Sequence, residues 1–388
     1  MDFAYGEEQE AVKELADRIF TERSTPERLK AVEAAADDAS GPFDRDLWTD
    51  LASAGLLGIG LSEDVGGAGL DFVAICLVVE AAGRTAAHVP VVETLVYGAA
   101  TIDRFGTAEQ RSTWLPRVAA GEVVLTAGLA ELVGDVVVPG DATPATTAAP
   151  DGAGGWRLDG TKACVPAGLV ADLVLVPATL LGQDGKPEGT GVFLVATDAA
   201  GVSRTRQDGP ALPEALVDLS GVVVGEGALL GGPGADGTAA VTFAVQHATA
   251  ALCVEEAGAT AASVALIGEY TKTREQFGKP IATFQAVGQR AADAYVDAEA
   301  IRLTAWQAAW RLSAGLPATA ELAVAKFWAA DGGQRVVHAA VHLHGGVGVD
   351  RDYPLHRYFL LTRQIELTLG GAHESLRRLG AVLAAEPA

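Results

Sequence analysis

The sequence predicts an α+β fold in which helices come first, a sheet-rich segment follows, and helices return. Apolar residues recur with helical periodicity towards both ends of the chain. The middle instead alternates short runs of valine and leucine with pairs of Gly, Pro and Asp. We therefore expect an N-terminal helical domain over 1–120, a middle β-barrel or sheet domain over 121–226, and a C-terminal helical bundle over 227–388.

The N-terminal segment carries three helix signals. Apolar residues recur every three to four positions from Glu7 to Phe20, as on one face of an amphipathic helix. The segment 71–82 is almost entirely apolar and predicts a buried helix. Thr107 is followed three residues later by Gln110, the spacing of a capping box that opens another helix.

The middle segment predicts short strands and one loop. Strands are expected around 156–158, 172–176 and 192–195, where apolar and β-branched residues are bounded by turn residues. The tract 139–155 is rich in Ala, Thr, Pro and Gly. Because few of its side chains are large and apolar, we expect this tract to be an exposed loop.

The C-terminal segment predicts a bundle. No proline interrupts the chain between the glycine-rich stretch 231–237 and Pro280, and this run predicts one long helix. Further helical patterns cover 289–312, 318–342 and 376–385.

Composition limits the classes of partner. The formal net charge of -22 repels phosphate backbones and anionic lipid surfaces, so neither nucleic acid nor a membrane is an expected partner. The uncharged apolar runs fall short of the roughly 20 residues of a membrane span, and the first residues lack the basic start of a secretory signal. We expect a cytoplasmic protein. Cys76, Cys164 and Cys253 are far apart and are read as small core residues rather than disulfide or zinc ligands.

The run from Thr273 to Gln285 allows two interpretations. As a helix end, it has a glycine cap at Gly278 and a proline that blocks further helix. As a binding site, Arg274 offers a planar fork of donors suited to a pyrophosphate, aromatic rings follow, and Gln285 offers an amide that both donates and accepts.

The pattern Arg-x-x-Phe-Gly-x-Pro-Ile-x-x-x-Gln, at the end of a long helix and in a helix–sheet–helix chain, resembles the FAD-dependent acyl-CoA dehydrogenase family. The resemblance implies an acyl-CoA dehydrogenase-like fold and FAD as the cofactor. In the family this segment reaches across a subunit interface to the neighbour's FAD. Arg274, Gln276, Phe277, Phe284 and Gln285 are therefore expected to contact the cofactor.

A second motif is His342-Leu-His-Gly-Gly346, which is similar to the family's Gln-x-x-Gly-Gly. The resemblance makes His342, Gly345 and Gly346 cofactor contacts, whereas a glycine helix cap explains the pair without a ligand. His338 and His342 have metal-ligand spacing, but no third ligand accompanies them and no metal is expected. Three further stretches match the family in order and spacing: 61–70, 158–162 and 354–357 with Arg363.

Dehydrogenation of an acyl thioester requires a carboxylate that takes the α proton while the β hydride passes to the flavin. Counting from Arg363 and from Arg274 places the family's two alternative glutamates at Leu369 and Ala248, and neither residue is a base. The family's flavin-ring signatures are also reduced, to 126–131 and 164–167. Six residues near these two positions are candidates to replace the missing glutamate as base: Glu366, Glu374, His373, His247, Glu255 and Glu256. Each also has an ordinary interpretation as a solvated or structural residue.

Three hypotheses follow. The first is a subunit that lacks its own base and lends structure and FAD contacts to a catalytic paralogue, similar to the two-component enzymes of steroid side-chain breakdown. The second is an independent acyl-CoA dehydrogenase with an unrecognised base. The third is a flavin-free acyl-CoA-binding scaffold. The family implies an acyl-CoA substrate, a homo- or hetero-oligomer built as a dimer of dimers, and electron-transfer flavoprotein as the electron acceptor.

Overall fold

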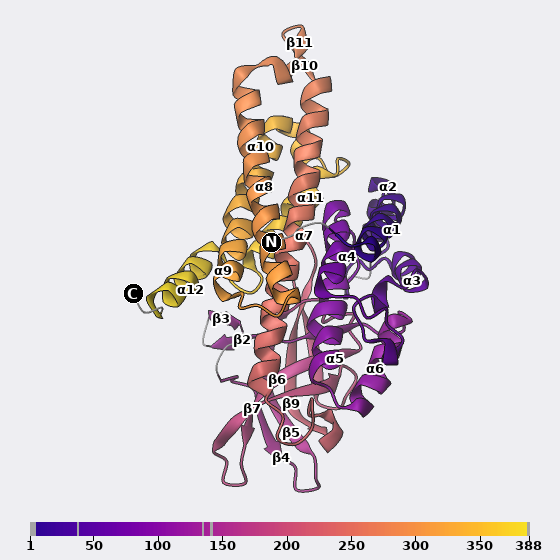
Figure 1. Cartoon of the computed structure of the whole chain (residues 1–388), viewed down its shortest axis with the longest axis vertical. Coiled ribbons are helices and arrows are strands. Elements are labelled where there is room, and N and C mark those ends of the chain that lie inside the picture. Colours follow the sequence, from indigo (N-terminus) through magenta and orange to yellow (C-terminus); the bar gives the residue numbers. More distant parts are fainter. Residues whose placement is uncertain (1–4, 37–38, 134–135, 140–142, 386–388) are drawn as a thin grey trace. The chain divides into compact units, whose positions relative to one another are not determined.

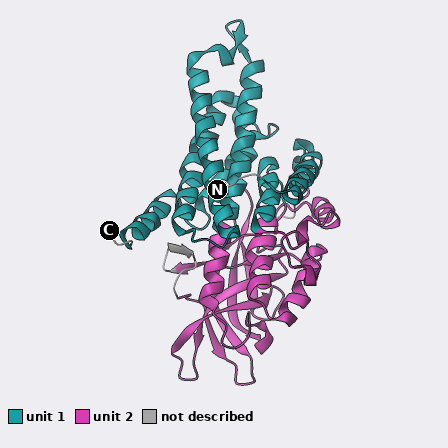
Figure 2. Cartoon of the chain, in the orientation of Figure 1, with its two compact units in different colours: residues 1–34, 72–88, 249–388 teal, residues 35–71, 89–248 magenta. Residues whose placement is uncertain are grey.

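The computed structural model describes residues 5–36, 39–133, 136–139 and 143–385. The chain divides into two compact units, each built from segments far apart in the sequence (Figure 2). Unit 1 comprises residues 1–34, 72–88 and 249–388, and unit 2 comprises residues 35–71 and 89–248. The domain boundaries expected at residues 120 and 226 stay predictions.

Unit 1 is helical (Figure 1). Its helices are α1 (Glu7–Arg23), α2 (Pro26–Ala34), α4 (Phe72–Thr85), most of α7 (Gly237–Thr273), α8 (Gln285–Ser313), α9 (Thr319–Phe327), α10 (Gly333–His344), α11 (Leu355–Leu367) and α12 (Ala372–Ala385). The predicted helices of the N- and C-terminal segments are confirmed. The one predicted over 318–342 is divided by a π-helical turn, Trp328–Gly332, which joins α9 to α10.

Helices α4 and α7 of unit 1 cross with their backbones almost in contact. A Cβ atom on Gly83 of α4 would lie 2.1 Å from the carbonyl oxygen of Glu255, and one on Gly258 of α7 would lie 2.2 Å from the carbonyl oxygen of Glu80. Side chains do not fit at these distances. The two glycines are therefore a condition of this packing.

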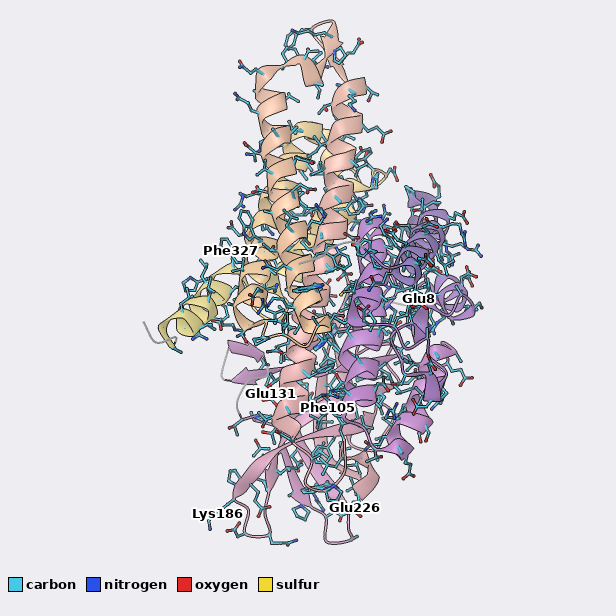
Figure 3. All side chains as sticks on the ribbon, in the orientation of Figure 1. Glu8, Phe105, Glu131, Lys186, Glu226 and Phe327 are labelled. Atoms are coloured by element: carbon cyan, nitrogen blue, oxygen red, sulfur yellow. The ribbon has the colours of Figure 1, made fainter. Side chains whose placement is uncertain are left out.

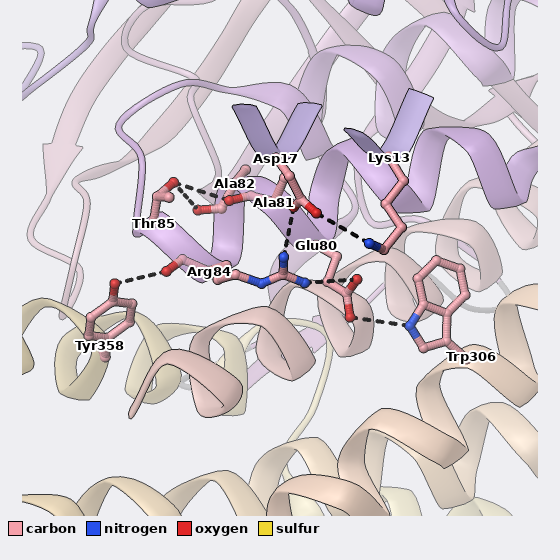
Figure 4. Close-up of polar contacts among 9 residues, drawn as sticks. All are labelled: Lys13, Asp17, Glu80, Ala81, Ala82, Arg84, Thr85, Trp306 and Tyr358. Atoms are coloured by element: carbon pink, nitrogen blue, oxygen red, sulfur yellow. Dashed lines mark hydrogen bonds and ion pairs between the residues drawn. The ribbon is translucent and has the colours of Figure 1, made fainter. Parts of the chain in front are cut away.

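A buried carboxylate connects the helices around this crossing (Figure 4). Trp306 Nε1 of α8 donates to Glu80 Oε1 at 3.3 Å, and Arg84 Nη2 lies 3.3 Å from Glu80 Oε2. Arg84 Nη1 also donates to Asp17 of α1 at 2.7 Å, and the Tyr358 hydroxyl of α11 donates to the Arg84 carbonyl at 2.8 Å. Burial raises the pKa of Glu80, against the opposing charge of Arg84. Four helices are joined by this one network.

Unit 2 combines helices with a mixed sheet. Its helical elements are α3 (Arg45–Ser53), a π-helix (Val92–Ala100), α5 (Thr101–Phe105), α6 (Ala108–Ala119) and the start of α7. The predicted capping box opens α6, because Gln110 N donates to Thr107 Oγ1 and Thr107 N donates to Gln110 Oε1.

The sheet has nine strands among the described residues: β1 (Leu125–Ala127), β2 (Ala130–Val133), β3 (Val136–Pro139), β4 (Thr147–Pro150), β5 (Trp156–Val165), β6 (Leu173–Leu181), β7 (Pro187–Ala196), β8 (Val202–Gln207) and β9 (Glu214–Val224). Strand β5 pairs antiparallel with β2, β4 and β9, whereas β6 pairs parallel with β1 and β4. Leu158, Val176 and Phe193 are in its core. The three predicted strands are confirmed.

The prediction of an exposed loop over 139–155 is wrong for residues 147–150. Residues 147–150 form β4, and Ala148 is fully buried in the sheet core. Residues on a strand alternate between faces, so one small alanine is enough to reach the core, and composition alone did not reveal it. Residues 140–142 of the tract lie outside the described residues.

A buried ion pair fastens β2 to β5 within unit 2. Glu131, labelled in Figure 3, lies directly opposite Lys162 in the antiparallel register. Glu131 Oε1 accepts from Lys162 Nζ at 2.5 Å and from Thr146 Oγ1 at 2.6 Å, and Oε2 accepts from Ala145 N at 2.6 Å. Lys162 is 1% exposed, and burial lowers its pKa to about 8 although Glu131 opposes the shift.

Helix α7 is long and apolar enough to pass a length-and-composition test for a membrane span. In its most apolar window, 67% of the residues are buried within the protein. That burial is typical of a core helix in a water-soluble fold.

Candidate functional site

The segment 274–285 forms a hairpin between α7 and α8 at one end of unit 1 (Figure 1). Helix α7 ends at Thr273, and strands β10 (Glu275–Gln276) and β11 (Lys279–Pro280) pair antiparallel around Phe277 and Gly278. Both turn residues have positive φ, 52° and 75°, as a two-residue type I′ hairpin turn requires. The prediction that Gly278 caps the helix is therefore wrong, because the glycine supplies a hairpin turn instead.

The hairpin presents its predicted contact residues to solvent. Arg274, Gln276 and Gln285 are exposed, and the Phe277 ring is 92% exposed. Phe277 meets Phe284 edge to face with 6.1 Å between ring centroids. Five predicted site residues are thus gathered at one hairpin: Arg274, Gln276, Phe277, Phe284 and Gln285.

The end of α10 supplies the second predicted group. His342, Gly345 and Gly346 are all exposed, and Gly345 N donates to the His342 carbonyl as a helix cap with φ of 62°. A Cβ atom on either glycine would meet nothing within 4 Å. The glycine cap is therefore confirmed, and the open space beside it also leaves room for a ligand to approach the backbone.

His344 connects this helix end to α7, and the sequence prediction missed it in favour of His342. The Tyr270 ring of α7 stacks on the His344 ring with 4.4 Å between centroids. His344 Nδ1 lies 2.7 Å from the Ala340 carbonyl, which only accepts, so Nδ1 carries the proton and Nε2 accepts from the Tyr353 hydroxyl at 3.0 Å. Burial lowers the pKa of His344, and the neutral ring fits this arrangement.

Arg357, one of the arginines that the family pattern places after proline, is used in an internal ion pair. Its Nε and Nη2 donate to the two Glu33 carboxylate oxygens of α2 at 2.6 and 2.8 Å, and His88 Nε2 lies 3.1 Å from Glu33 Oε1. Partial burial alone would raise the pKa of Glu33. The hydrogen bonds from His88 and Arg357 and the guanidinium charge outweigh it and lower the pKa to about 2.

This ion pair predicts a pH-dependent difference in stability. We expect Glu33→Gln to lower the free energy of unfolding by about 2 kcal/mol at pH 7, because a hydrogen-bonded charge is lost beside buried Arg357. The folded pKa lies below the unfolded value, so the contribution is full above about pH 4.5 and is lost as the pH falls towards 2. Urea unfolding of both proteins between pH 7 and pH 3 measures it. An energy difference that stays constant across this range would contradict the assignment.

Neither position where the family's base was expected holds an acid. Ala248 is an ordinary helical residue, whereas Leu369 has a strained backbone. Ala248 on α7 is fully buried in unit 2. Leu369, in the turn between α11 and α12 of unit 1, is 8% exposed and has φ of 57°. A positive φ is uncommon for a residue with a branched side chain.

The carboxylates considered as replacements near Leu369 are held by other groups. Glu366 Oε2 accepts from Arg363 Nη1 at 2.6 Å and from Gln334 Nε2. Glu374 accepts from Arg377 and Arg378, whose hydrogen bonds lower its pKa to about 2 against partial desolvation. A carboxylate with such a low pKa is a weak base.

The other candidate replacement bases are His247, Glu255 and Glu256 on α7 and His373 on α12. His247 Nδ1 lies 2.9 Å from the Phe243 carbonyl, its ring stacks on Phe243, and burial lowers its pKa to about 4. Glu256 is fully buried in unit 1, where burial raises its pKa well above the ordinary value. His373 is exposed, and Glu255 is partly buried.

The three cysteines are free thiols. Cys76 and Cys253 are buried as predicted, whereas Cys164 is half-buried with φ of 49°, and burial raises its pKa to about 11. Among the described residues, no group of three or more His, Cys, Asp or Glu side chains is arranged to hold a metal ion.

A helical unit, a mixed sheet and an exposed Arg–Phe–Gln hairpin are the features expected of an acyl-CoA dehydrogenase, and comparison with known proteins identifies the same family. Residues 6–122 match the acyl-CoA dehydrogenase N-terminal domain, and residues 235–382 match the acyl-CoA dehydrogenase C-terminal domain. The chain is 37% identical to acyl-CoA dehydrogenase FadE27 of Mycobacterium tuberculosis over 397 aligned residues, with 100% of each chain covered. It belongs to the acyl-CoA dehydrogenase family.

Two solved structures extend the comparison. One is the ChsE4-ChsE5 complex from Mycobacterium tuberculosis, with a TM-score of 0.90, 38% identity and 100% of each chain covered. The other is a variant of the Tcur3481-Tcur3483 steroid ACAD, with a TM-score of 0.85, 43% identity and 98% of each chain covered. The α+β fold and FAD as the family's cofactor are thereby established for this chain.

The residues of the hairpin fit such a cofactor chemically. An exposed guanidinium suits a pyrophosphate, the exposed Phe277 ring suits a flat ring system, and the open backbone at Gly345 and Gly346 permits close approach. When bound, FAD accepts the hydride of the dehydrogenation.

Proposed function

We propose that this chain is a subunit of a two-component acyl-CoA dehydrogenase, which lends FAD contacts to a catalytic paralogue and lacks a base of its own. The observation that carries the proposal is Leu369, an apolar residue in the turn where the family's base is expected. Ala248 leaves the alternative position without an acid as well. The hairpin at 274–285 nevertheless keeps its exposed binding residues.

The chain lacks a base at Leu369 but has the residues expected to contact FAD. This combination supports an active site shared between two subunits. In the family the hairpin serves the neighbouring subunit's FAD, so selection can retain Arg274, Gln276, Phe277, Phe284 and Gln285 in a chain whose own turn is inactive. His342, Gly345 and Gly346 are proposed to contact the cofactor from α10. In this proposal the residues of this chain bind and orient FAD, and the paralogue removes the α proton of the substrate.

An exposed apolar stripe on α8 supports an oligomer. Tyr295, Val296 and Leu303 are exposed on this helix, and Leu303 lies about two turns after Val296 on the same side. Exposed apolar groups that line up on one helix face are typical of protein interfaces. We propose that a second acyl-CoA dehydrogenase-family chain covers them, within a dimer of dimers.

The relatives indicate a substrate class. One similar structure is named as the ChsE4-ChsE5 complex, and the other as a Tcur3481-Tcur3483 steroid ACAD. We propose a cytoplasmic enzyme of lipid or steroid side-chain breakdown that converts an acyl-CoA to its trans-2-enoyl thioester and passes electrons to electron-transfer flavoprotein.

Visible absorbance spectra of the chain purified alone and of the chain co-expressed with a paralogue test the proposal. We expect the chain purified alone not to bleach flavin absorbance when an acyl-CoA is added, and the chain co-expressed with a paralogue to do so. A chain that bleaches alone is an independent enzyme with an unrecognised base. A chain that binds acyl-CoA but acquires no flavin in either preparation is a scaffold.

Substitution of Arg274 tests the proposed FAD contact directly. Arg274→Ala in the co-expressed complex is expected to weaken FAD binding by about 2 kcal/mol, roughly 30-fold in Kd, because a charged hydrogen-bond donor is removed. Titration of apo-complex with FAD, followed by flavin fluorescence, measures the change. Arg290→Ala is the matched control, since Arg290 is also exposed but lies on α8 beyond the motif. Equal Kd values for both variants would refute the contact.

A further inference from the structure

A buried lysine of α9 contacts the C-terminal end of α11, the helix that precedes Leu369. Lys326 of α9 is 2% exposed, and its Nζ donates to the carbonyls of Ile365 and Glu366 at 2.5 and 3.2 Å. The last carbonyls of an α-helix have no partners within the helix, and a cation near them is favourable. Lys326 therefore caps the C-terminus of α11 and holds the backbone that enters the turn.

The same helix is held one turn earlier from α7. Glu256, 0% exposed, accepts a hydrogen bond at Oε1 from the Thr362 hydroxyl of α11 at 2.9 Å. Its Oε2 is buried without a hydrogen-bond partner among the residues that the structure describes. Burial raises the pKa of Glu256 and lowers that of Lys326 to about 8. A Cβ atom on Gly333 would lie 2.4 Å from Glu256 Oε1, so a larger residue there would displace this carboxyl group.

The turn itself is fixed on both sides. Thr368 N and Oγ1 both donate to the Gln364 carbonyl, at 3.0 and 2.9 Å. Beyond the turn, Arg378 Nη1 of α12 donates to the Leu369 carbonyl at 3.5 Å. The left-handed conformation is unfavourable for a non-glycine residue and persists only where surrounding contacts enforce it.

We propose that Lys326 and Arg378 are positioning residues that keep the turn 368–371 ready to present a base, so that Leu369 is the one missing side chain at this position. The inference rests on the proposed function, in which the native chain has no base.

The chemistry to be restored is a proton transfer. A glutamate at position 369 would take the α proton of an acyl thioester: the C–H bond breaks, an O–H bond forms, and the electron pair moves onto the thioester carbonyl as an enolate. In D2O the reverse step returns a deuteron to the α carbon. No oxidant is consumed, so exchange reports the base separately from dehydrogenation.

The experiment follows exchange of the α protons of octanoyl-CoA in D2O by proton NMR, with the full chain in its complex with a paralogue whose own base has been removed. We expect background exchange with the native chain and with Leu369→Gln, and exchange about 100-fold above background with Leu369→Glu. Adding Lys326→Met or Arg378→Met to Leu369→Glu is expected to lower exchange at least 10-fold in folded protein. Adding Glu33→Gln, which removes an ion pair elsewhere in unit 1, is expected to leave exchange unchanged.

The outcomes separate the two claims. Exchange by the native chain, above background, would refute the proposed function. A silent native chain together with a silent Leu369→Glu would overturn the positioning inference and leave the proposed function intact. Exchange by Leu369→Glu that neither Lys326→Met nor Arg378→Met lowers would also overturn it. If Lys326→Met does not fold, as judged by circular dichroism, the Arg378→Met variant decides the matter.

Discussion

Replacing Glu131 by alanine is expected to lower the free energy of unfolding by about 4 kcal/mol, because it leaves a charged amine buried without its partner. Lys162 is 1% exposed and lies on β5, in the interior of the sheet. The substitution also removes the acceptor of the Thr146 hydroxyl and of the Ala145 and Thr146 amides. Urea unfolding at pH 7, followed by circular dichroism, measures the loss.

A double-mutant cycle separates the ion pair from its surroundings. Lys162→Met alone is also expected to destabilise, because the carboxylate then loses its cation. The combination of Glu131→Ala with Lys162→Met should cost less than the sum of the two single changes, since no unpaired charge remains. Additive costs would show that the two groups do not interact.

Replacing Gly258 by alanine is expected to lower the free energy of unfolding by about 3 kcal/mol, through overpacking at the crossing of α4 and α7. The added methyl group would lie 2.2 Å from the Glu80 carbonyl oxygen and 2.7 Å from Arg84 N. Both are backbone atoms, so no side chain can rotate away, and the two helices must separate.

Gly268 provides the matched control on the same helix. A Cβ atom at Gly268 meets nothing within 4 Å. Alanine is a better helix former than glycine, so Gly268→Ala is expected to raise stability by about 0.5–1 kcal/mol. Thermal unfolding of the two variants side by side makes the comparison, and a similar effect of both would contradict a steric role for Gly258.

Local patterns in the sequence predicted much of the fold because each reports a local property. Helical periodicity predicted α1, an almost entirely apolar segment predicted α4, and the capping spacing predicted the start of α6. The π-helical turn at 328–332 and strand β4 were missed. A one-residue insertion in a helix leaves the apolar pattern nearly intact, and β4 has only alanine to mark its buried face.

The candidate site divides in the same way. Arg274, Phe277 and Gln285 are close in sequence, so their grouping was predictable. The predicted glycine cap was wrong, because α7 ends at Thr273 and Gly278 lies in a hairpin turn five residues later. His344 was overlooked because its role depends on Tyr270 and Tyr353, which the sequence does not connect to it.

The sequence by itself determined the order of helices and sheet, the family motif at 274–285 and the absence of a carboxylate at positions 248 and 369. Only the tertiary structure decided that Lys326 holds the end of α11, that Glu131 pairs with Lys162, and that α4 and α7 cross at glycines. The physical reason is that periodicity records which side chains are buried, whereas the partner of a buried charge depends on which distant segments the fold brings within hydrogen-bond distance.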